Sequence, residues 1–167
     1  MGLYKNNKSA KRKLKVFEGF AGYGGASFGL MKAKIPFKVV GFSEFDKDAI
    51  ELYSYNFPDV KNWGDITQIN EKKLPNFDLF TGGFPCQPFS SVGKRLGELD
   101  IRGTLFADIV RICEFKQPKY ILLENVKGLC VGKHKPTFEK IMTELHRIGY
   151  DTRYAILNSK DYGVPQT

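Results

Sequence analysis

The hydrophobic positions of the chain alternate between short continuous runs and runs with helical spacing. Short segments with apolar residues, placed between the helical segments, predict strands at residues 14–20, 39–43, 62–66, 77–81, 120–126 and 152–157. Apolar residues at helical spacing predict helices at residues 26–33, 46–56, 105–115 and 137–148. Strands that alternate with helices are typical of an α/β chain with a largely parallel sheet. We therefore expect one α/β domain.

The segment 82–104 breaks this rhythm. It follows an apolar strand, has no clear period, and is rich in Gly, Pro and Ser. Long irregular loops in compact domains are usually functional, and at the end of a parallel strand they lie where open α/β sheets bind ligands. We expect functional side chains in this segment.

A glycine-rich turn and two acids indicate a first site. The turn FAGYGG at residues 20–25 joins the first strand to the first helix, where a backbone without side chains can approach a ligand. Glu44 follows the second strand and Asp65 lies at the end of the third, so they would meet the turn at one edge of the sheet. Such acids suit a ribose and an adenine amino group. The residue types leave open a nicotinamide dinucleotide, S-adenosylmethionine, or a tight turn without a ligand.

A thiol and a carboxyl indicate a second site. Cys86 lies between Pro85 and Pro88 in the irregular loop, which favours a positioned nucleophile over a buried structural cysteine. Glu124 ends an apolar strand, where packing has no need of a charge; the alternative is a solvated strand end. A nucleophile and an acid beside a nucleoside cofactor suggest covalent catalysis with proton donation.

Composition and charge add limits to this interpretation. The chain has 167 residues, 42% of them hydrophobic, and a formal net charge of +8, as in a soluble globular protein. Residues 1–15 carry six Lys and Arg residues and no acid, which predicts a flexible basic arm that is either solubilising or a contact for a polyanion. We place the domain at residues 16–167.

No signal for export or membrane anchoring is visible, so we expect a cytoplasmic location. Three cysteines without paired spacing predict free thiols, with Cys113 and Cys130 as core residues. His134 and His146 fit no metal-ligand spacing, so we expect no metal.

Several motifs in order resemble those of the DNA (cytosine-5) methyltransferase family over nearly the whole chain. They are FAGYGG at 20–25, GFSEFD with Glu44, GDI at 64–66, GGFPCQPFS at 82–90, RGTLF at 102–106, ENV at 124–126 and DYGVPQ at 161–166. The resemblance implies a Rossmann-like methyltransferase fold and a bacterial or phage protein that methylates double-stranded DNA, with restriction-modification as its usual setting.

The resemblance also implies roles for individual residues. The residues expected to hold S-adenosylmethionine are Phe20, Ala21, Gly22, Gly24, Gly25, Glu44, Phe45, Asp65, Ile66, Pro85 and Leu105. Cys86 would attack C6 of a flipped cytosine while Glu124 stabilises or protonates N3. The residues expected to position the nucleotide and its backbone are Ser90, Arg102, Asn125 and Val126. The product would be S-adenosylhomocysteine.

The chain departs from the family pattern after Gln166, where a pair of arginines, a target-recognition region and a closing helix are expected. We interpret the chain as an incomplete methyltransferase fold that works with a complementary C-terminal chain. The alternative is an inactive truncated fragment that retains partial cofactor binding. A dinucleotide oxidoreductase, the third hypothesis, is disfavoured by the Pro-Cys-Gln and Glu-Asn-Val motifs.

Overall fold

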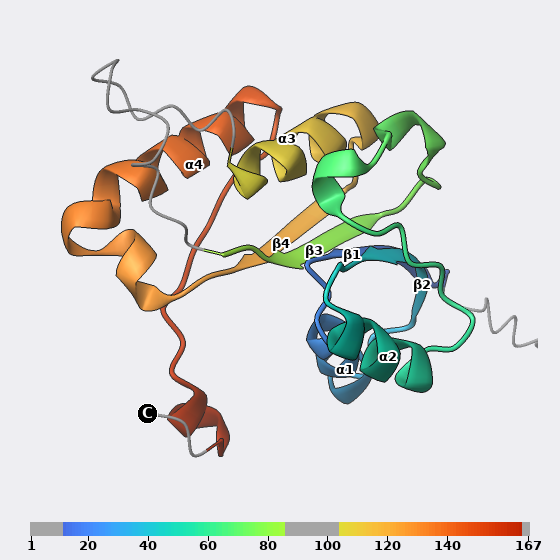
Figure 1. Ribbon diagram of the computed structural model, residues 1–167. Coiled ribbons are helices and arrows are strands. Elements are labelled where there is room, and N and C mark those ends of the chain that lie inside the picture. Colours follow the sequence, from blue (N-terminus) through green and yellow to red (C-terminus); the bar gives the residue numbers. More distant parts are fainter. Residues whose placement is uncertain (1–11, 86–103, 165–167) are drawn as a thin grey trace, which may run out of the picture. The chain divides into compact units, whose positions relative to one another are not determined.

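The computed structural model describes residues 12–85 and 104–164 (Figure 1). The described residues fall into two units. The first comprises residues 12–83 and 115–123, and the second comprises residues 84–85, 104–114 and 124–164.

The first unit contains a four-stranded parallel sheet with the order β2-β1-β3-β4. Its strands are β1 (Leu14–Gly19), β2 (Phe37–Ser43), β3 (Leu79–Gly83) and β4 (Tyr120–Glu124), whose last residue is grouped with the second unit. Val16 of β1 is in register with Val39 of β2 and Leu79 of β3. Because β1 has a neighbour on both sides, its central residues are fully buried.

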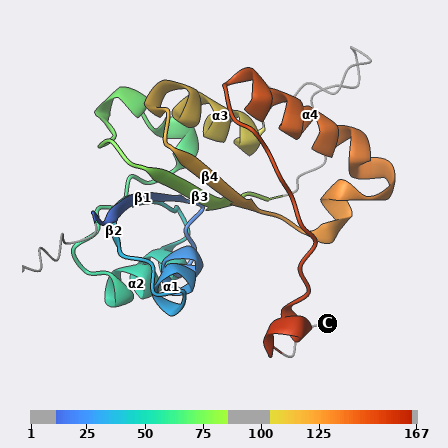
Figure 2. The ribbon, with the colours of Figure 1, turned by 180° about the vertical axis from the view of Figure 1, so that it is seen from behind.

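Two helices of the first unit lie on the same side of β1 and β2, as both views show (Figures 1 and 2). These are α1 (Gly25–Lys32) and α2 (Lys47–Asn56). Leu30 of α1 packs with Val16 and Leu79. The ring of Tyr53 in α2 stacks on Phe42 of β2 with their centroids 3.8 Å apart. Successive side chains of a strand point to opposite faces of the sheet. Val16 therefore faces the helices, whereas Phe17 lies on the other face and packs on Phe77 and Phe80.

A buried carboxylate joins three elements of this unit. Glu18 of β1 is 1% exposed, and its Oε1 atom accepts hydrogen bonds from the hydroxyls of Ser27 in α1 and Tyr53 in α2. Burial raises the pKa of the Glu18 carboxyl, while the hydrogen bonds from Ser27 and Tyr53 lower it. A buried polar group of this kind must be satisfied by partners of fixed geometry, so Glu18 fixes the position of both helices against β1.

The second unit contains α4 (Lys135–Arg147) and most of α3 (Leu105–Lys116), which lie side by side in both views. Arg147 connects the two helices by an ion pair with Glu114 of α3 at 2.7 Å, and it also bonds Glu144 within α4. Ile141 and Leu145 form the buried stripe of α4. The described ranges also contain the short 3-10 helices η1 (Ile66–Gln68) and η2 (Glu71–Lys73) in the first unit, and η3 (Lys127–Cys130), η4 (Gly132–His134) and η5 (Ser159–Tyr162) in the second.

Two of the expected strands are absent from the described residues. At 62–66 the backbone forms only an isolated bridge between Phe42 and Asn62, because Asn62 uses its side chain to tie the following loop and η1 begins at Ile66. At 152–157 the described backbone is irregular and forms no strand. The expected arm over 1–15 overlaps β1, which begins at Leu14; residues 1–11 lie outside the described part.

We expect Glu18→Gln to remove a pH dependence of stability. The pKa of Glu18 is higher in the folded chain than in the unfolded chain, so its contribution to stability is complete below the ordinary carboxyl pKa. That contribution is lost as the pH rises through the folded pKa. Thermal unfolding measured at increasing pH above the ordinary carboxyl pKa should therefore show a decline in wild type that the variant lacks.

The matched control is Glu51→Gln, at an exposed position of α2. This variant should keep the wild-type pH dependence. Parallel unfolding curves for wild type and Glu18→Gln would show that the Glu18 carboxyl does not titrate as its burial predicts.

We expect Gly24→Ala to destabilise the first unit. Gly24 precedes α1 with φ of 94°, and an added Cβ would lie 2.6 Å from Cε2 of Phe57. Left-handed backbone and overpacking each cost about 1–3 kcal/mol. Chemical denaturation should detect this loss, and the neighbouring Gly25→Ala, whose Cβ would have only one neighbour at 4.0 Å, should be close to neutral. Equal destabilisation by both would contradict the prediction.

Candidate functional site

The glycine turn between β1 and α1 has an unusual backbone. Phe20 and Gly22 have φ of 52° and 53°, and Gly24 has φ of 94°. Two hydrogen bonds hold the turn, from Gly24 N–H to the Ala21 carbonyl at 2.9 Å and from Ala21 N–H to the Ser43 carbonyl of β2 at 3.1 Å. No atom lies within 4 Å of a Cβ built on Gly22. The turn is thus open at Gly22, and only glycine adopts this conformation without strain.

Glu44 lies directly against this turn. Its Oε2 atom accepts the Gly22 N–H at 2.9 Å, and its Oε1 atom accepts the N–H groups of Phe45 at 2.8 Å and Asp46 at 3.0 Å. A carboxylate has about four acceptor positions, so a donor from a ligand can still bond Oε2. The turn and Glu44 therefore meet at one edge of the sheet, as predicted, through the hydrogen bond between Gly22 and Glu44, which are 22 residues apart in the sequence.

Asp65 is placed by two residues that the sequence did not single out. The Oδ1 atom of Asn62 accepts the N–H groups of Glu44 at 3.3 Å and Gly64 at 2.9 Å, and its Nδ2 atom donates to the Glu44 carbonyl. The hydroxyl of Ser43 donates to the Gly64 carbonyl at 2.6 Å. These bonds hold the loop before Asp65 against the end of β2. Neither residue type, at these positions, is distinctive enough to be recognised from one sequence.

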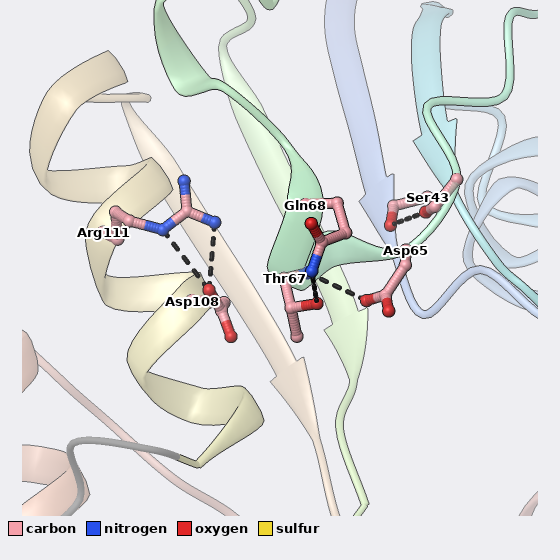
Figure 3. Close-up of polar contacts among 7 residues, drawn as sticks. Ser43, Asp65, Thr67, Gln68, Asp108 and Arg111 are labelled. Carbon is pink, nitrogen blue, oxygen red and sulfur yellow. Dashed lines mark hydrogen bonds and ion pairs between the residues drawn. The ribbon is translucent and has the colours of Figure 1, made fainter.

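The side chain of Asp65 caps the short helix that follows it. Its Oδ1 atom accepts the Thr67 N–H at 2.9 Å, and Gln68 donates to the Thr67 hydroxyl (Figure 3). Asp65 remains exposed, whereas Ile66 is 3% exposed and forms part of the core. Figure 3 also shows the pair of Asp108 and Arg111 within α3, which is local to that helix.

Other features at the carboxyl ends of the strands suit a ligand. The ring of Phe45 is 73% exposed and follows Glu44 directly. The hydroxyl of Thr81 in β3 is buried without a hydrogen-bond partner in the described part of the chain, and Thr81 is in register with Glu18. An exposed aromatic ring, an open glycine turn and acceptor carboxylates are groups that can contact a bound ligand.

The second unit contains the expected residues that follow β3 and β4. The Nδ2 atom of Asn125 donates to the Phe84 carbonyl at 2.7 Å, although 41 residues separate them. Phe84 packs against Phe106 with their centroids 5.5 Å apart. Asn125 thus tethers the chain two residues before Cys86. The remaining predicted residues of this unit are Pro85, Leu105, Glu124 and Val126, of which Leu105 is half-buried and the others are exposed.

Cys86, Ser90 and Arg102 lie outside the described residues. Of the other thiols, Cys113 is fully buried, and burial raises the pKa of its thiol above the ordinary value. The Sγ atom of Cys130 bonds the Lys127 carbonyl at 3.2 Å. A thiol is nucleophilic as the thiolate, so the environment of Cys113 makes it unreactive.

Within the described ranges, no group of three or more His, Cys, Asp or Glu side chains could hold a metal ion. None of the helices in the same ranges has the length and apolar character that crossing a bilayer requires.

Two curated methyltransferases are similar to this chain in sequence. The type II methyltransferase M1.ScrFI of Lactococcus lactis subsp. cremoris is 45% identical over 163 residues, which cover 98% of this chain and 41% of that protein. The orphan methyltransferase M.Rho11sI of Bacillus phage rho11s is 43% identical over 92% of this chain and 31% of its own length. The chain therefore spans less than half the length of these relatives.

The fold is also similar to that of solved methyltransferase structures, again over less than half of their length. The Dnmt2 methyltransferase of S. pombe superimposes with a TM-score of 0.62 and 30% sequence identity, over 78% of this chain and 42% of that one. A model of the family described as C-5 cytosine-specific DNA methylase matches residues 14–167. The chain thus belongs to the C-5 cytosine-specific DNA methylase family.

Proposed function

We propose that this chain is the catalytic portion of a DNA (cytosine-5) methyltransferase that acts on double-stranded DNA. The observation that carries the proposal is the contact between the Gly22 N–H and the Glu44 carboxylate, because it joins the glycine turn to the acid expected on a ribose. Membership of the family supplies the reaction class.

The cofactor proposed for the glycine turn is S-adenosylmethionine, which supplies an electrophilic methyl group when bound. Glu44 retains an acceptor position for a ribose hydroxyl. Asp65 is exposed and held by its loop to accept from an adenine amino group, and the exposed ring of Phe45 offers a stacking surface. The other residues proposed to line the cofactor are Phe20, Ala21, Gly22, Gly24, Gly25, Ile66, Pro85 and Leu105.

The proposed nucleophile is Cys86. Its thiolate adds to C6 of a flipped cytosine, and Glu124 hydrogen bonds or protonates N3 as negative charge develops on the ring. After the methyl group is on C5, loss of the C5 proton and breakage of the bond between sulfur and C6 release the cysteine. Asn125, through its bond to Phe84, holds the start of the loop that carries Cys86. Ser90, Arg102 and Val126 are proposed to contact the nucleotide.

The proposed partner is a complementary C-terminal chain. β4 lies at the edge of the sheet with Leu122 58% exposed. In the second unit Tyr154, Ile156 and Leu157 are exposed by 65%, 52% and 70%. Exposed strand edges and apolar side chains recruit another chain or aggregate. This exposure supports the proposal that the protein needs a second polypeptide for full activity.

We expect Asp65→Ala to weaken binding of S-adenosylmethionine about tenfold or more, since a lost hydrogen bond to a charged group costs about 1.5–3 kcal/mol. Asp65→Asn should weaken binding less, because it keeps the cap on Thr67 and one acceptor oxygen. Calorimetric titration measures both. Asp48→Ala, at an exposed position of α2, is the control, and equal affinity of wild type and Asp65→Ala would remove Asp65 from the site.

We expect Cys86 to form a covalent adduct with DNA that contains 5-fluorocytosine, because fluorine at C5 prevents the final loss of a proton. The reaction mixture contains a complementing C-terminal chain. Denaturing electrophoresis should show the adduct in wild type and in Cys130→Ser but not in Cys86→Ser.

An adduct that persists in Cys86→Ser would identify a different nucleophile. Sequence-specific methylation by the chain alone, as a monomer in size-exclusion chromatography, would contradict the need for a partner. No methylation with any complementing chain would favour the inactive fragment.

A further inference from the structure

Cations of the first unit gather at the end of its sheet where the strands begin, although Asp78 and Glu71 also lie near that end. The acids Glu44, Asp46 and Asp65 follow the carboxyl end of β2 or the loop tied to it. Lysines instead gather where the strands begin. The cations in or next to the amino ends of the strands, or in the connections that lead to them, are Arg12, Lys13, Lys15, Lys32, Lys34, Lys38, Lys72, Lys73, Lys116 and Lys119.

Backbone contacts place three of these lysines in one row. Lys15 of β1 is in register with Lys38 of β2. On the other side of β1, the Asp78 N–H donates to the Lys15 carbonyl at 2.8 Å, and the Asp78 carbonyl accepts the Tyr120 N–H at 3.0 Å. Lys119 precedes Tyr120, and its Nζ atom lies 5.0 Å from the centre of the Tyr120 ring. The row therefore crosses the sheet from β2 to β4.

A second group of lysines adjoins this edge through α3. The Nζ atom of Lys116, at the end of α3, donates to the Leu74 carbonyl at 2.6 Å. Leu74 directly follows Lys72 and Lys73 of η2, both of which are exposed. Lys116 is thereby fixed beside two further cations.

The acid at this edge does not neutralise the row. The two oxygens of Asp78 are taken by the Arg12 guanidinium at 2.8 Å and by the backbone N–H of Lys15 at 2.9 Å. The side chains of Lys15 and Lys38 are exposed, and neither forms an ion pair with an acid among the described residues. Like charges directly opposite on neighbouring strands are destabilising. The arrangement thus lowers stability, and a bound anion would reverse that effect.

We propose that Lys15, Lys38 and Lys119, named here the amino-edge lysines, bind the phosphate backbone of duplex DNA without regard to base sequence. This surface lies at the edge of the sheet opposite to the glycine turn, so it is distinct from the site proposed for the cofactor. The row has the charge that phosphates require and no exposed acid between its members. The choice of DNA as the polyanion rests on the proposed function.

Contacts of this kind position a protein on a duplex and carry no sequence information. They hold the protein on DNA at sites that contain no target base and raise the local concentration of DNA for the catalytic site.

The test is binding to a short duplex built only of A·T pairs, which has no cytosine and so does not depend on the proposed methylation. Fluorescence anisotropy is measured over a series of salt concentrations. In the variant Lys15→Ala/Lys38→Ala/Lys119→Ala we expect about a tenfold or greater loss of affinity at low salt. We also expect the slope of log K against log salt to become shallower by about 2 to 3, since each phosphate contact contributes about 0.9.

The matched control is Lys47→Ala/Lys61→Ala/Lys160→Ala, which removes the same charge from positions outside the amino edge. This control should keep most of the affinity and the slope. Replacement of the three amino-edge lysines by arginine should restore binding, which also excludes an effect of misfolding. Circular dichroism and thermal unfolding monitor the fold of each variant.

Equal losses in the alanine variant and its control would overturn the proposal, because binding would then follow net charge alone. An unchanged slope in the alanine variant would overturn it as well. Cosedimentation with vesicles that contain anionic lipid is the third comparison. An effect of the alanine variant on vesicles and none on the duplex would assign the surface to a membrane and reject DNA.

Discussion

The position of the candidate cofactor site depends on the buried carboxylate of Glu18. The turn that leads to Gly22 begins two residues after Glu18, and the helices that flank this turn are fixed to the same oxygen atom through Ser27 and Tyr53. Desolvation of a carboxylate is unfavourable, and each of the two hydroxyls offsets part of that cost only in one geometry. A sheet with an apolar residue at this position would pack as well, but it would not specify where α1 begins relative to α2. The unfavourable burial of Glu18 is therefore coupled to the precision of the turn.

A second level of organisation begins at Asn62. Its side chain bonds the N–H and the carbonyl of Glu44 and the N–H of Gly64, so one amide connects the backbone beside the two acids that are proposed to hold a nucleoside. Glu44 contributes to the same construction, because it accepts three backbone N–H groups besides any ligand. Substitution of Glu44 would thus alter the backbone of the turn together with the contact to a ligand, whereas Asp65 can be changed with a smaller effect on the fold.

The sequence predicted well those elements that local pattern determines. Four helices and four strands were expected close to their observed limits, because apolar period and flanking Gly, Asp or Pro are local signals; Asp46, for example, caps α2 through the Ala49 N–H. The run at 62–66 was wrong as a strand, since Asn62 replaces ladder bonds by side-chain bonds. The run at 152–157 was also wrong as a strand: its described backbone is irregular, and its apolar content alone does not determine whether a strand forms. The roles of Ser43 and Asn62 depend on contacts between distant segments and were not recognisable.

The order β2-β1-β3-β4 also has a consequence for the way in which the sheet is built up. β1 and β2 are separated by one helix, so their pairing closes a short loop. β4 joins β3 only after the chain from Phe84 to Lys119 has been closed into a loop, and such closure carries a larger entropic cost. β4 has one neighbour in this sheet and no fully buried residue. Its backbone amides should belong to the part of the first unit that opens most readily to hydrogen exchange, ahead of those of β1.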